Sequence, residues 1–230
     1  MSRRLSKQQY QQLLGGIATH IMIEQYPHRI AGPTTLFPIT AKLNKVKYQS
    51  MIDDTYNSNL KNVHHKPIIL ELSLTNAVAI YQSKRSKTPH TLSYKEACHA
   101  IEIIKRQWLA LPQIHGLMIT NAPLFIDKIS LCHDILLRSQ PLKPKPPLSI
   151  IIGAKTFYEI FRQKYYGQRQ YKYANFYMHL SRASEAFYLV FPYRQYMSLE
   201  TFLTQSTTAS RLSHIMTWFN TIDMSKDIKC

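Results

Sequence analysis

The sequence predicts an α/β protein in which a parallel sheet is covered by helices on both faces, a doubly wound fold. Two observations predict it. Short, continuous apolar runs rich in β-branched residues recur at residues 68–72, 116–120, 148–152 and 187–191. Runs of this kind are typical of strands buried on both faces. Segments in which apolar residues recur with helical spacing alternate with these runs, and that alternation favours a parallel sheet.

The first predicted helix lies between the first two predicted strands, in the segment SYKEACHAIEIIKRQWLALP. Apolar side chains repeat there with helical spacing, and Pro112 ends the pattern. The repeating residues are Ala97, Ile101, Ile104 and Trp108. The order predicted for this part of the chain is therefore strand, helix, strand.

A second helix is predicted after residue 120, in NAPLFIDKISLCHDILLRS. Asn121 can cap it and Pro123 fits its first turn, while Leu124, Ile135 and Leu136 belong to its apolar face. The proline-rich segment SQPLKPKPP then predicts an extended connector to the next strand.

Ligands of doubly wound domains collect at the carboxyl ends of the strands. Two such ends carry polar residues or glycine, the Thr120–Asn121 step and Gly153. Gly153 separates the apolar run PLSIII from the aromatic-rich amphipathic segment KTFYEIFRQKYYG. It is either a nucleotide-binding turn or an ordinary tight corner.

The remaining chain is predicted as a short N-terminal extension and one domain. Residues 1–30 include YQQLLGGIATHIMIEQYP, which is a helix interrupted at Gly15–Gly16 or two short pieces, so this extension is predicted to be helical. Residues 31–230 form the α/β domain. A chain of 230 residues with 45% hydrophobic residues can bury a substantial core.

Composition restricts the partners and the compartment. Lys and Arg total 29 against 13 Asp and Glu, a net charge of +16, and a field of this sign attracts phosphates. The three cysteines, Cys98, Cys132 and Cys230, include no close pair, so a reducing cytoplasm is expected and a metal knuckle is not. No apolar run predicts a membrane span or a signal peptide. His64–His65 has no ligand spacing around it, and no metal site is predicted.

Three motifs at the predicted strand ends resemble, in this order, those of the cytidylyltransferase-like, nicotinamide-nucleotide adenylyltransferase family. They are LELSLTNA (residues 70–77), ITNAPLFIDK (119–128) and IIGAKTFYEIFRQKYYG (151–167). FYLVFPYR, ending at Arg194, is similar to the family strand that leads to a VxGR element. QSTTASR (205–211) resembles the late ISSTxIR signature. The resemblance covers residues 36–211.

The resemblance implies a Rossmann-like fold and transfer of an adenylyl group from ATP to a mononucleotide such as nicotinamide mononucleotide, with Mg²⁺ and release of pyrophosphate. Catalysis of this kind consists of alignment and charge neutralisation. It also implies a set of nucleotide-binding residues: Lys42, Thr120, Asn121, Gly153, Thr156, Arg194, Ser206, Thr207 and Thr208. Lys45 and Arg211 would be the catalytic residues.

The early family motif, FPGSFNPLHxGH, has lost its key residues here. It aligns with FPITAKLNKVKY (37–48), where Ile39 replaces a glycine and Lys45 and Tyr48 replace the two histidines. Lysine supplies charge from a flexible stem but not the compact ring donor of histidine. In the third motif Lys155 replaces an acid. We therefore expect weak activity or none, that is, a pseudoenzyme that keeps the fold.

Several of these residues have simpler interpretations that stay open. Lys42, Lys45 and Lys47 form a solvated basic loop in the alternative interpretation. Ser206, Thr207 and Thr208 are sufficient as helix caps. A different class of function is a basic nucleic-acid-binding protein without catalysis, because basic and aromatic residues interleave in RQKYYGQRQYKYANFYMH (162–179).

Overall fold

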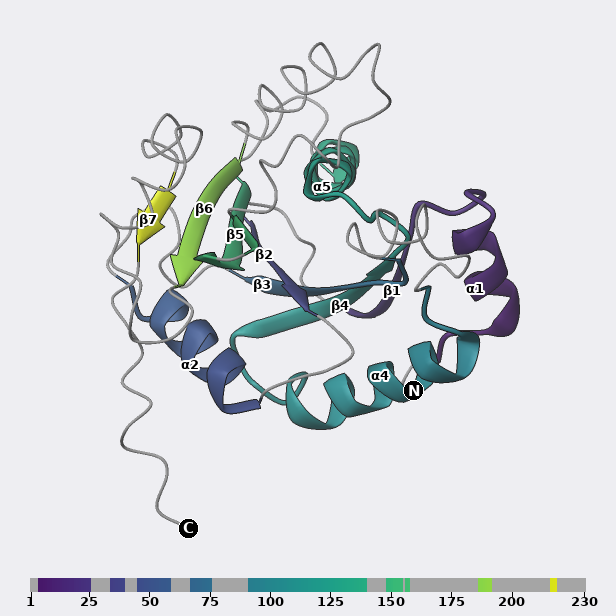
Figure 1. Cartoon of the computed structure of the whole chain (residues 1–230), viewed down its shortest axis with the longest axis horizontal. Coiled ribbons are helices and arrows are strands. Elements are labelled where there is room, and N and C mark those ends of the chain that lie inside the picture. The colour runs from purple at the N-terminus through teal and green to yellow at the C-terminus, as the bar shows by residue number, and fades with distance from the viewer. Residues whose placement is uncertain are drawn as a thin grey trace, which may run out of the picture.

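The computed structural model describes residues 4–25, 34–39, 45–58, 67–75, 91–139, 148–154, 156–157, 186–191 and 216–218. Its helices are α1 (Lys7–Leu14), α2 (Lys45–Tyr56), α4 (Tyr94–Gln107) and α5 (Phe125–Ser139). Its strands are β1 (His20–Gln25), β2 (Thr34–Ile39), β3 (Ile68–Ser73), β4 (Ile114–Thr120), β5 (Leu148–Gly153), β6 (Ala186–Phe191) and β7 (Met216–Trp218). Figure 1 shows their arrangement.

The strands form one seven-stranded sheet in the order β1-β4-β3-β2-β5-β6-β7. β1 is antiparallel to β4, and every other pair of neighbours is parallel. Numbered along the chain, the parallel strands are arranged 3-2-1-4-5-6, the doubly wound order in which the direction of winding reverses between β2 and β5. The predicted Rossmann-like fold class is confirmed.

Two hydrophobic clusters cover the two faces of the sheet. In β3, Leu70 and Leu72 belong to the cluster that includes α4 residues, whereas Ile69 belongs to the cluster that includes α5 residues. This is the alternation expected of a strand between two layers. In Figure 1, α2 and α4 lie on one side of the sheet and α5 lies on the other.

All four strands predicted from apolar runs are present, as β3, β4, β5 and β6. Helix α4 is also as predicted: Ala97, Ile101 and Ile104 are buried. Ser93 and Glu96 form a capping box at its start, in which each side chain accepts a hydrogen bond from the backbone N–H of the other. The helix ends at Gln107, before Pro112 is reached.

The predicted start of α5 was wrong. The helix begins at Phe125, so Asn121 does not cap it and Pro123 precedes it. Proline disfavours helical backbone in the residue before it, here Ala122. Ala122 N–H instead donates to Thr120 Oγ1 (3.3 Å), which keeps this turn with the end of β4.

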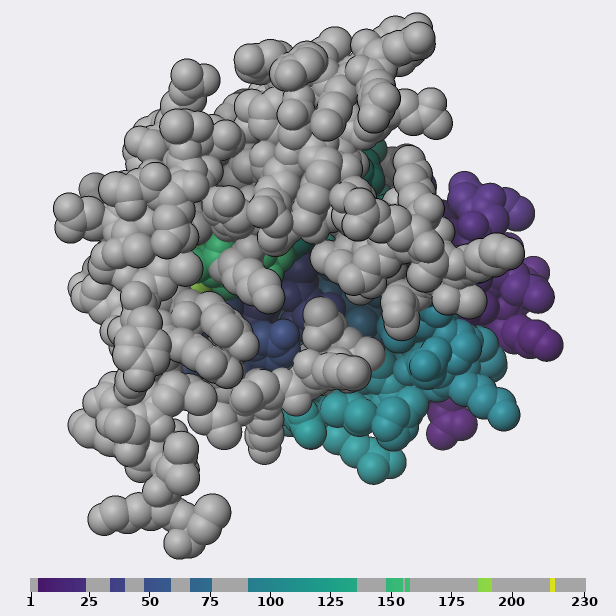
Figure 2. All heavy atoms as spheres, viewed as in Figure 1, coloured from purple at the N-terminus to yellow at the C-terminus, as the bar shows by residue number. Residues whose placement is uncertain are grey.

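The N-terminal segment is only partly helical. α1 ends at Leu14, Gly15 is its C-cap, and β1 follows as an edge strand. α1 also packs on the start of α4: the rings of Tyr10 and Tyr94 lie 5.6 Å apart, and Tyr10 Oη donates to the Leu92 carbonyl (2.7 Å). Figure 2 shows the atoms of α1 and α4 on one side of the visible face. None of the described helices is long and apolar enough to cross a membrane.

Replacement of Gly16 by alanine is expected to lower the free energy of unfolding by about 1–2 kcal/mol. Gly16 has a φ of 71°, in the left-handed region, and an added Cβ would meet none of the described residues within 4 Å. The cost is therefore a backbone cost. Urea unfolding measures it, with Gly153→Ala as the matched control, because Gly153 is not among the positive-φ glycines. Equal stability of the two variants would contradict the prediction.

Candidate functional site

The candidate site lies at the edge of the sheet where the parallel strands end. The last residues of the five strands concerned are Ile39, Ser73, Thr120, Gly153 and Phe191. Because these strands are parallel to one another, their carboxyl ends lie at one edge (Figure 1). Ligands of doubly wound domains bind outside this edge, at the point where the strand order reverses. In this chain that point lies between β2 and β5.

β2 and β5 separate from each other before either strand ends. β2 stays paired with β3 as far as Ile39, and β5 stays paired with β6 as far as Gly153. The pairing between β2 and β5 themselves stops at Leu36 and Ile150. The carboxyl-terminal halves of the two strands are therefore not paired with each other, at the place where a ligand site is expected.

Pro38 explains why this pairing stops. The N–H of Thr35 donates to the Pro67 carbonyl (3.0 Å), on the side of β3. Because backbone N–H groups alternate between the two neighbours of a strand, position 38 would direct its N–H toward β5. Proline has no N–H to donate, so it cannot continue the ladder on that side.

Helix α2 is the next described element after β2 along the chain, and it begins at Lys45. A helix N-terminus presents unpaired backbone N–H groups and partial positive charge, and α2 has no acidic residue in its first turn. The side chains of residues 45–47 and the whole of Lys42 lie outside the described residues. The structure thus places Lys45 at the helix start but does not describe where its ammonium group lies.

Tyr48 is part of the core between α2, β2 and α4. Its ring centroid lies 5.3 Å from that of Phe37 and 6.3 Å from that of Trp108. Trp108 is 1% exposed. Sequence reasoning aligned Tyr48 with the second histidine of the adenylyltransferase motif. In this chain the residue packs α2 onto the sheet.

Gly153 ends β5 without needing glycine for its own backbone. An added Cβ would lie 4.0 Å from the Phe191 carbonyl oxygen, an ordinary van der Waals distance. Helical backbone begins at Ala154, and Thr156 is exposed while Phe157 is buried. Among the described residues, space for a Cβ is therefore left open at a strand end that is paired with β6 but not with β2, and a ligand can use this space to approach the backbone.

Inside the sheet edge lies a buried ion pair between β3 and α5. Glu71 is completely buried, and Lys128 is 4% exposed. Lys128 Nζ lies 2.7 Å from both carboxylate oxygens of Glu71, and Thr120 Oγ1 donates to Glu71 Oε1 at 2.5 Å. A buried carboxylate requires partners of this kind, since an unpaired one is strongly disfavoured.

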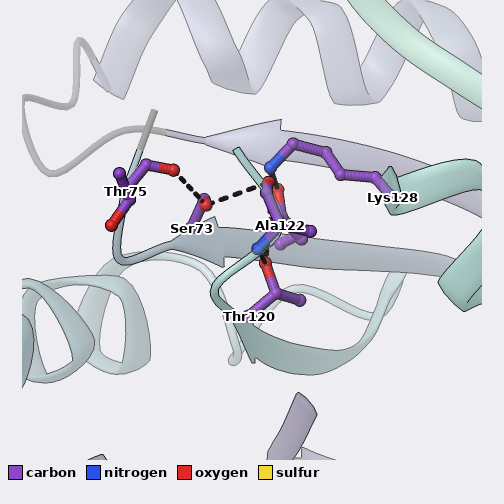
Figure 3. A network of polar contacts seen from close by, with 6 residues as sticks. Ser73, Thr75, Thr120, Ala122 and Lys128 are labelled. Atoms are coloured by element: carbon purple, nitrogen blue, oxygen red, sulfur yellow. Dashed lines mark hydrogen bonds and ion pairs between the residues drawn. The ribbon is translucent and has the colours of Figure 1, made fainter. Parts of the chain in front are cut away.

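Ser73, two residues beyond Glu71 in β3, connects the loops that follow β3 and β4 (Figure 3). Its hydroxyl lies within hydrogen-bond distance of two carbonyl oxygens, that of Thr75 (2.5 Å) and that of Ala122 (3.1 Å). Thr75 in turn pairs with Thr91, their hydroxyl oxygens 3.0 Å apart. The turn at residues 120–122 is therefore held from β3, from β4 and from α5.

Asn121, in the middle of this turn, carries an unsatisfied amide oxygen. Its Oδ1 is covered from solvent and has no hydrogen-bond partner among the described residues. An unsatisfied buried acceptor costs about 1–3 kcal/mol, so it calls for an explanation. The predicted binding residue Thr120, by contrast, is completely buried and already donates to Glu71.

Cys132, one turn further along α5, lies in the same interior. Burial, and to a lesser extent the Glu71 carboxylate, raise the pKa of its thiol from 9.0 to about 12, against an opposing effect of Lys128. The thiolate is the reactive form of cysteine, so this thiol is inert in the folded protein at neutral pH.

The other predicted site residues fall outside the described residues. They are Arg194, Ser206, Thr207, Thr208 and Arg211. The basic and aromatic segment 162–179 and His64–His65 also fall outside them. Within the described part of the chain, no group of three or more His, Cys, Asp or Glu side chains could hold a metal ion.

Sequence reasoning did not single out Glu71 and Lys128 as a pair. A signal was available, because Glu71 is the one charged residue within the apolar run IILEL. An acid in a strand that is buried on both faces must find a cation. The sequence does not say which lysine or arginine provides it.

The strand order and the parting of β2 and β5 define the class of protein as a doubly wound α/β domain with an open switch point. Comparisons of the chain with protein-family models, with curated proteins and with solved structures found no match.

Proposed function

We propose that the chain is a nucleotidyltransferase-like protein that binds a nucleotide, with its phosphates at the switch point between β2 and β5. The observation that carries the proposal is the parting of these two strands beyond Leu36 and Ile150. Doubly wound domains bind nucleotides at this point of the sheet, with phosphates at a helix N-terminus.

Three further features support a phosphate ligand. Lys45 begins the helix that follows β2, and Gly153 leaves room for a phosphate to approach the backbone. The net charge of +16 increases the local concentration of anions around the whole chain. Magnesium would arrive on the triphosphate oxygens, as Mg²⁺ commonly does.

Adenylyl transfer is proposed to be weak or lost. The transfer needs donors aimed at the charge that develops on the leaving pyrophosphate. Tyr48 occupies one of the two aligned histidine positions, and its ring packs against Phe37 and Trp108. Restoring histidine there would remove a core contact, so reversal of the substitution is not expected to restore activity.

Gly153→Ala is the variant that tests nucleotide binding. We expect it to weaken binding of ATP with Mg²⁺ at least tenfold, because the new methyl group occupies the space that the phosphate needs. Stability should not fall, since among the described residues the methyl group meets only the Phe191 carbonyl oxygen, at 4.0 Å. Isothermal titration calorimetry measures the affinity and urea unfolding the stability.

The matched control is Gly16→Ala, at the other glycine turn. This variant should lose stability and keep the affinity for ATP, the reverse of Gly153→Ala. Wild-type protein that gives neither binding heat nor a thermal shift with ATP would overturn the proposal. Equal affinity of wild type and Gly153→Ala would place the phosphates elsewhere.

A separate assay tests transfer. The protein is incubated with ATP, nicotinamide mononucleotide and Mg²⁺, and pyrophosphate and dinucleotide are measured. We expect turnover no higher than that of a Lys45→Ala, Arg211→Ala double variant. Clear turnover above this control would show that the lost histidines are not required.

A further inference from the structure

The turn at residues 120–122 is more firmly held than the packing of the sheet requires. Leu74 N–H donates to the Thr120 carbonyl (2.8 Å), Ser73 reaches the Ala122 carbonyl, and Thr120 is tied to the Glu71–Lys128 pair. Apolar residues would cover the same face of the sheet without burying two charges. The network therefore fixes the position of one turn at the carboxyl edge, and Asn121 is the residue at its centre.

Asn121 is also the one member of the turn whose polar group is unsatisfied. Its Oδ1 lacks a donor among the described residues, although its neighbours Thr120 and Ala122 are both hydrogen-bonded. An amide oxygen accepts hydrogen bonds only, so the missing partner is an N–H or O–H group. Binding has to uncover the oxygen, and a new hydrogen bond would offset that cost.

The distance between the switch point and Asn121, at the end of β4, is similar to the distance between the phosphates and the base of a nucleotide. β3 and β4 follow β2 on the side away from β5. Neighbouring strands are about 4.8 Å apart, so β4 lies about 10 Å from β2. The ribose and base of a nucleotide with its phosphates at the switch point extend over such a distance, so a base on this side of the switch point reaches the ends of β3 and β4.

We propose that Asn121 accepts a hydrogen bond from an amino or amide N–H of the base, and that Glu71, Lys128 and Thr120 are positioning residues that hold Asn121 for this contact. The inference rests on the proposed nucleotide binding and adds the chemistry by which the base is recognised. It selects bases that carry an N–H donor over those with an oxygen in the same place.

Two matched ligand pairs test the selection. ATP and ITP differ in whether the purine carries an amino group or an oxygen, and nicotinamide and nicotinic acid mononucleotide differ in whether the pyridine carries an amide or a carboxylate. Wild type should bind the member with the exocyclic amino or amide group, in at least one pair, about tenfold more tightly, which corresponds to one hydrogen bond of about 1.4 kcal/mol. The pair that shows the preference identifies which nucleotide lies over β3 and β4.

Asn121→Ala should abolish that preference by weakening the binding of the preferred ligand alone. The matched control is Asn57→Ala, an exposed asparagine that follows the last turn of α2. This control should keep the wild-type preference. An Asn121→Ala protein that is folded and keeps the preference overturns the inference.

The positioning role is tested with the double variant Glu71→Gln, Lys128→Met, which removes both charges and leaves an oxygen for the Thr120 hydroxyl. We expect faster amide exchange at Ala122 with unchanged exchange at Ala97 in α4, and loss of the base preference. A double variant with the wild-type preference shows that the pair acts on stability alone and overturns this part.

The outcomes distinguish a failure of this inference from a failure of the proposed nucleotide binding on which it rests. Wild type that binds none of the four nucleotides overturns both. Wild type that binds ATP in a manner sensitive to Gly153→Ala, but binds both members of each pair equally, keeps the nucleotide site and overturns the role of Asn121.

Discussion

Replacement of Lys128 by methionine is expected to lower the free energy of unfolding by about 3–5 kcal/mol. The variant leaves Glu71 completely buried with its main partner gone, and Thr120 Oγ1 remains as a donor to it. A single hydroxyl does not replace an ammonium group that lies 2.7 Å from both carboxylate oxygens. The expected loss is a large fraction of the stability of an ordinary domain.

The double variant Glu71→Gln, Lys128→Met distinguishes the loss of one partner of the ion pair from the loss of both partners. Neither position then carries a charge, and glutamine keeps an oxygen for Thr120. Replacing both partners of a buried pair costs far less than removing one, so the double variant should regain at least half of the loss. Urea unfolding of wild type, both single variants and the double variant measures this cycle. Additive losses would contradict the prediction and would mean that the two side chains do not stabilise each other.

The sequence predicted the parts of the fold in which local pattern and environment agree. The run LSIII became β5 because it is continuous, short and β-branched, as a strand between two layers of helices must be. Helix α4 was equally predictable, since its capping box and its apolar spacing both lie within one segment.

The parts that were missed depend on contacts between distant residues. β2 was not predicted, because Pro38 is atypical of a central strand; the strand keeps its pairing with β3 as far as Ile39 and gives up the pairing with β5 beyond Leu36, where proline lacks the N–H to continue it. β1 was not predicted, because HIMIEQ follows a helix across Gly15–Gly16 and becomes a strand by pairing with β4.

The features of the candidate site also divide into those that a local sequence pattern predicts and those that depend on contacts between distant residues. Gly153 and the Thr120–Asn121 step were correctly expected at strand ends, because the end of an apolar run is visible in the sequence. The order of the strands, which puts β2 beside β5, is a property of the whole sheet. The partner of Glu71 lies 57 residues away along the chain, so no local pattern identifies it.

Cys132 is expected to make the fold sensitive to alkali. Burial raises the pKa of its thiol from 9.0 to about 12, chiefly by removing water and secondly through the Glu71 carboxylate. The folded state therefore holds a proton that the unfolded state releases near pH 9. The stabilisation is complete below pH 9 and is lost as the pH rises from 9 to 12, by about 4 kcal/mol in all.

Cys132→Ala isolates this contribution. The variant should be less stable than wild type at pH 7, because it loses buried contacts, and the difference should shrink as the pH rises above 9. Tyrosines such as Tyr10, whose pKa burial also raises, titrate in the same range but are common to both proteins and cancel in the difference.

Urea unfolding of the reduced proteins between pH 7 and 11 measures the difference in the free energy of unfolding. Parallel curves of unfolding free energy against pH for wild type and Cys132→Ala would contradict the prediction. They would mean that the thiol ionises as readily in the folded state as in the unfolded state. The interior beside Glu71 and Lys128 would then have to admit water.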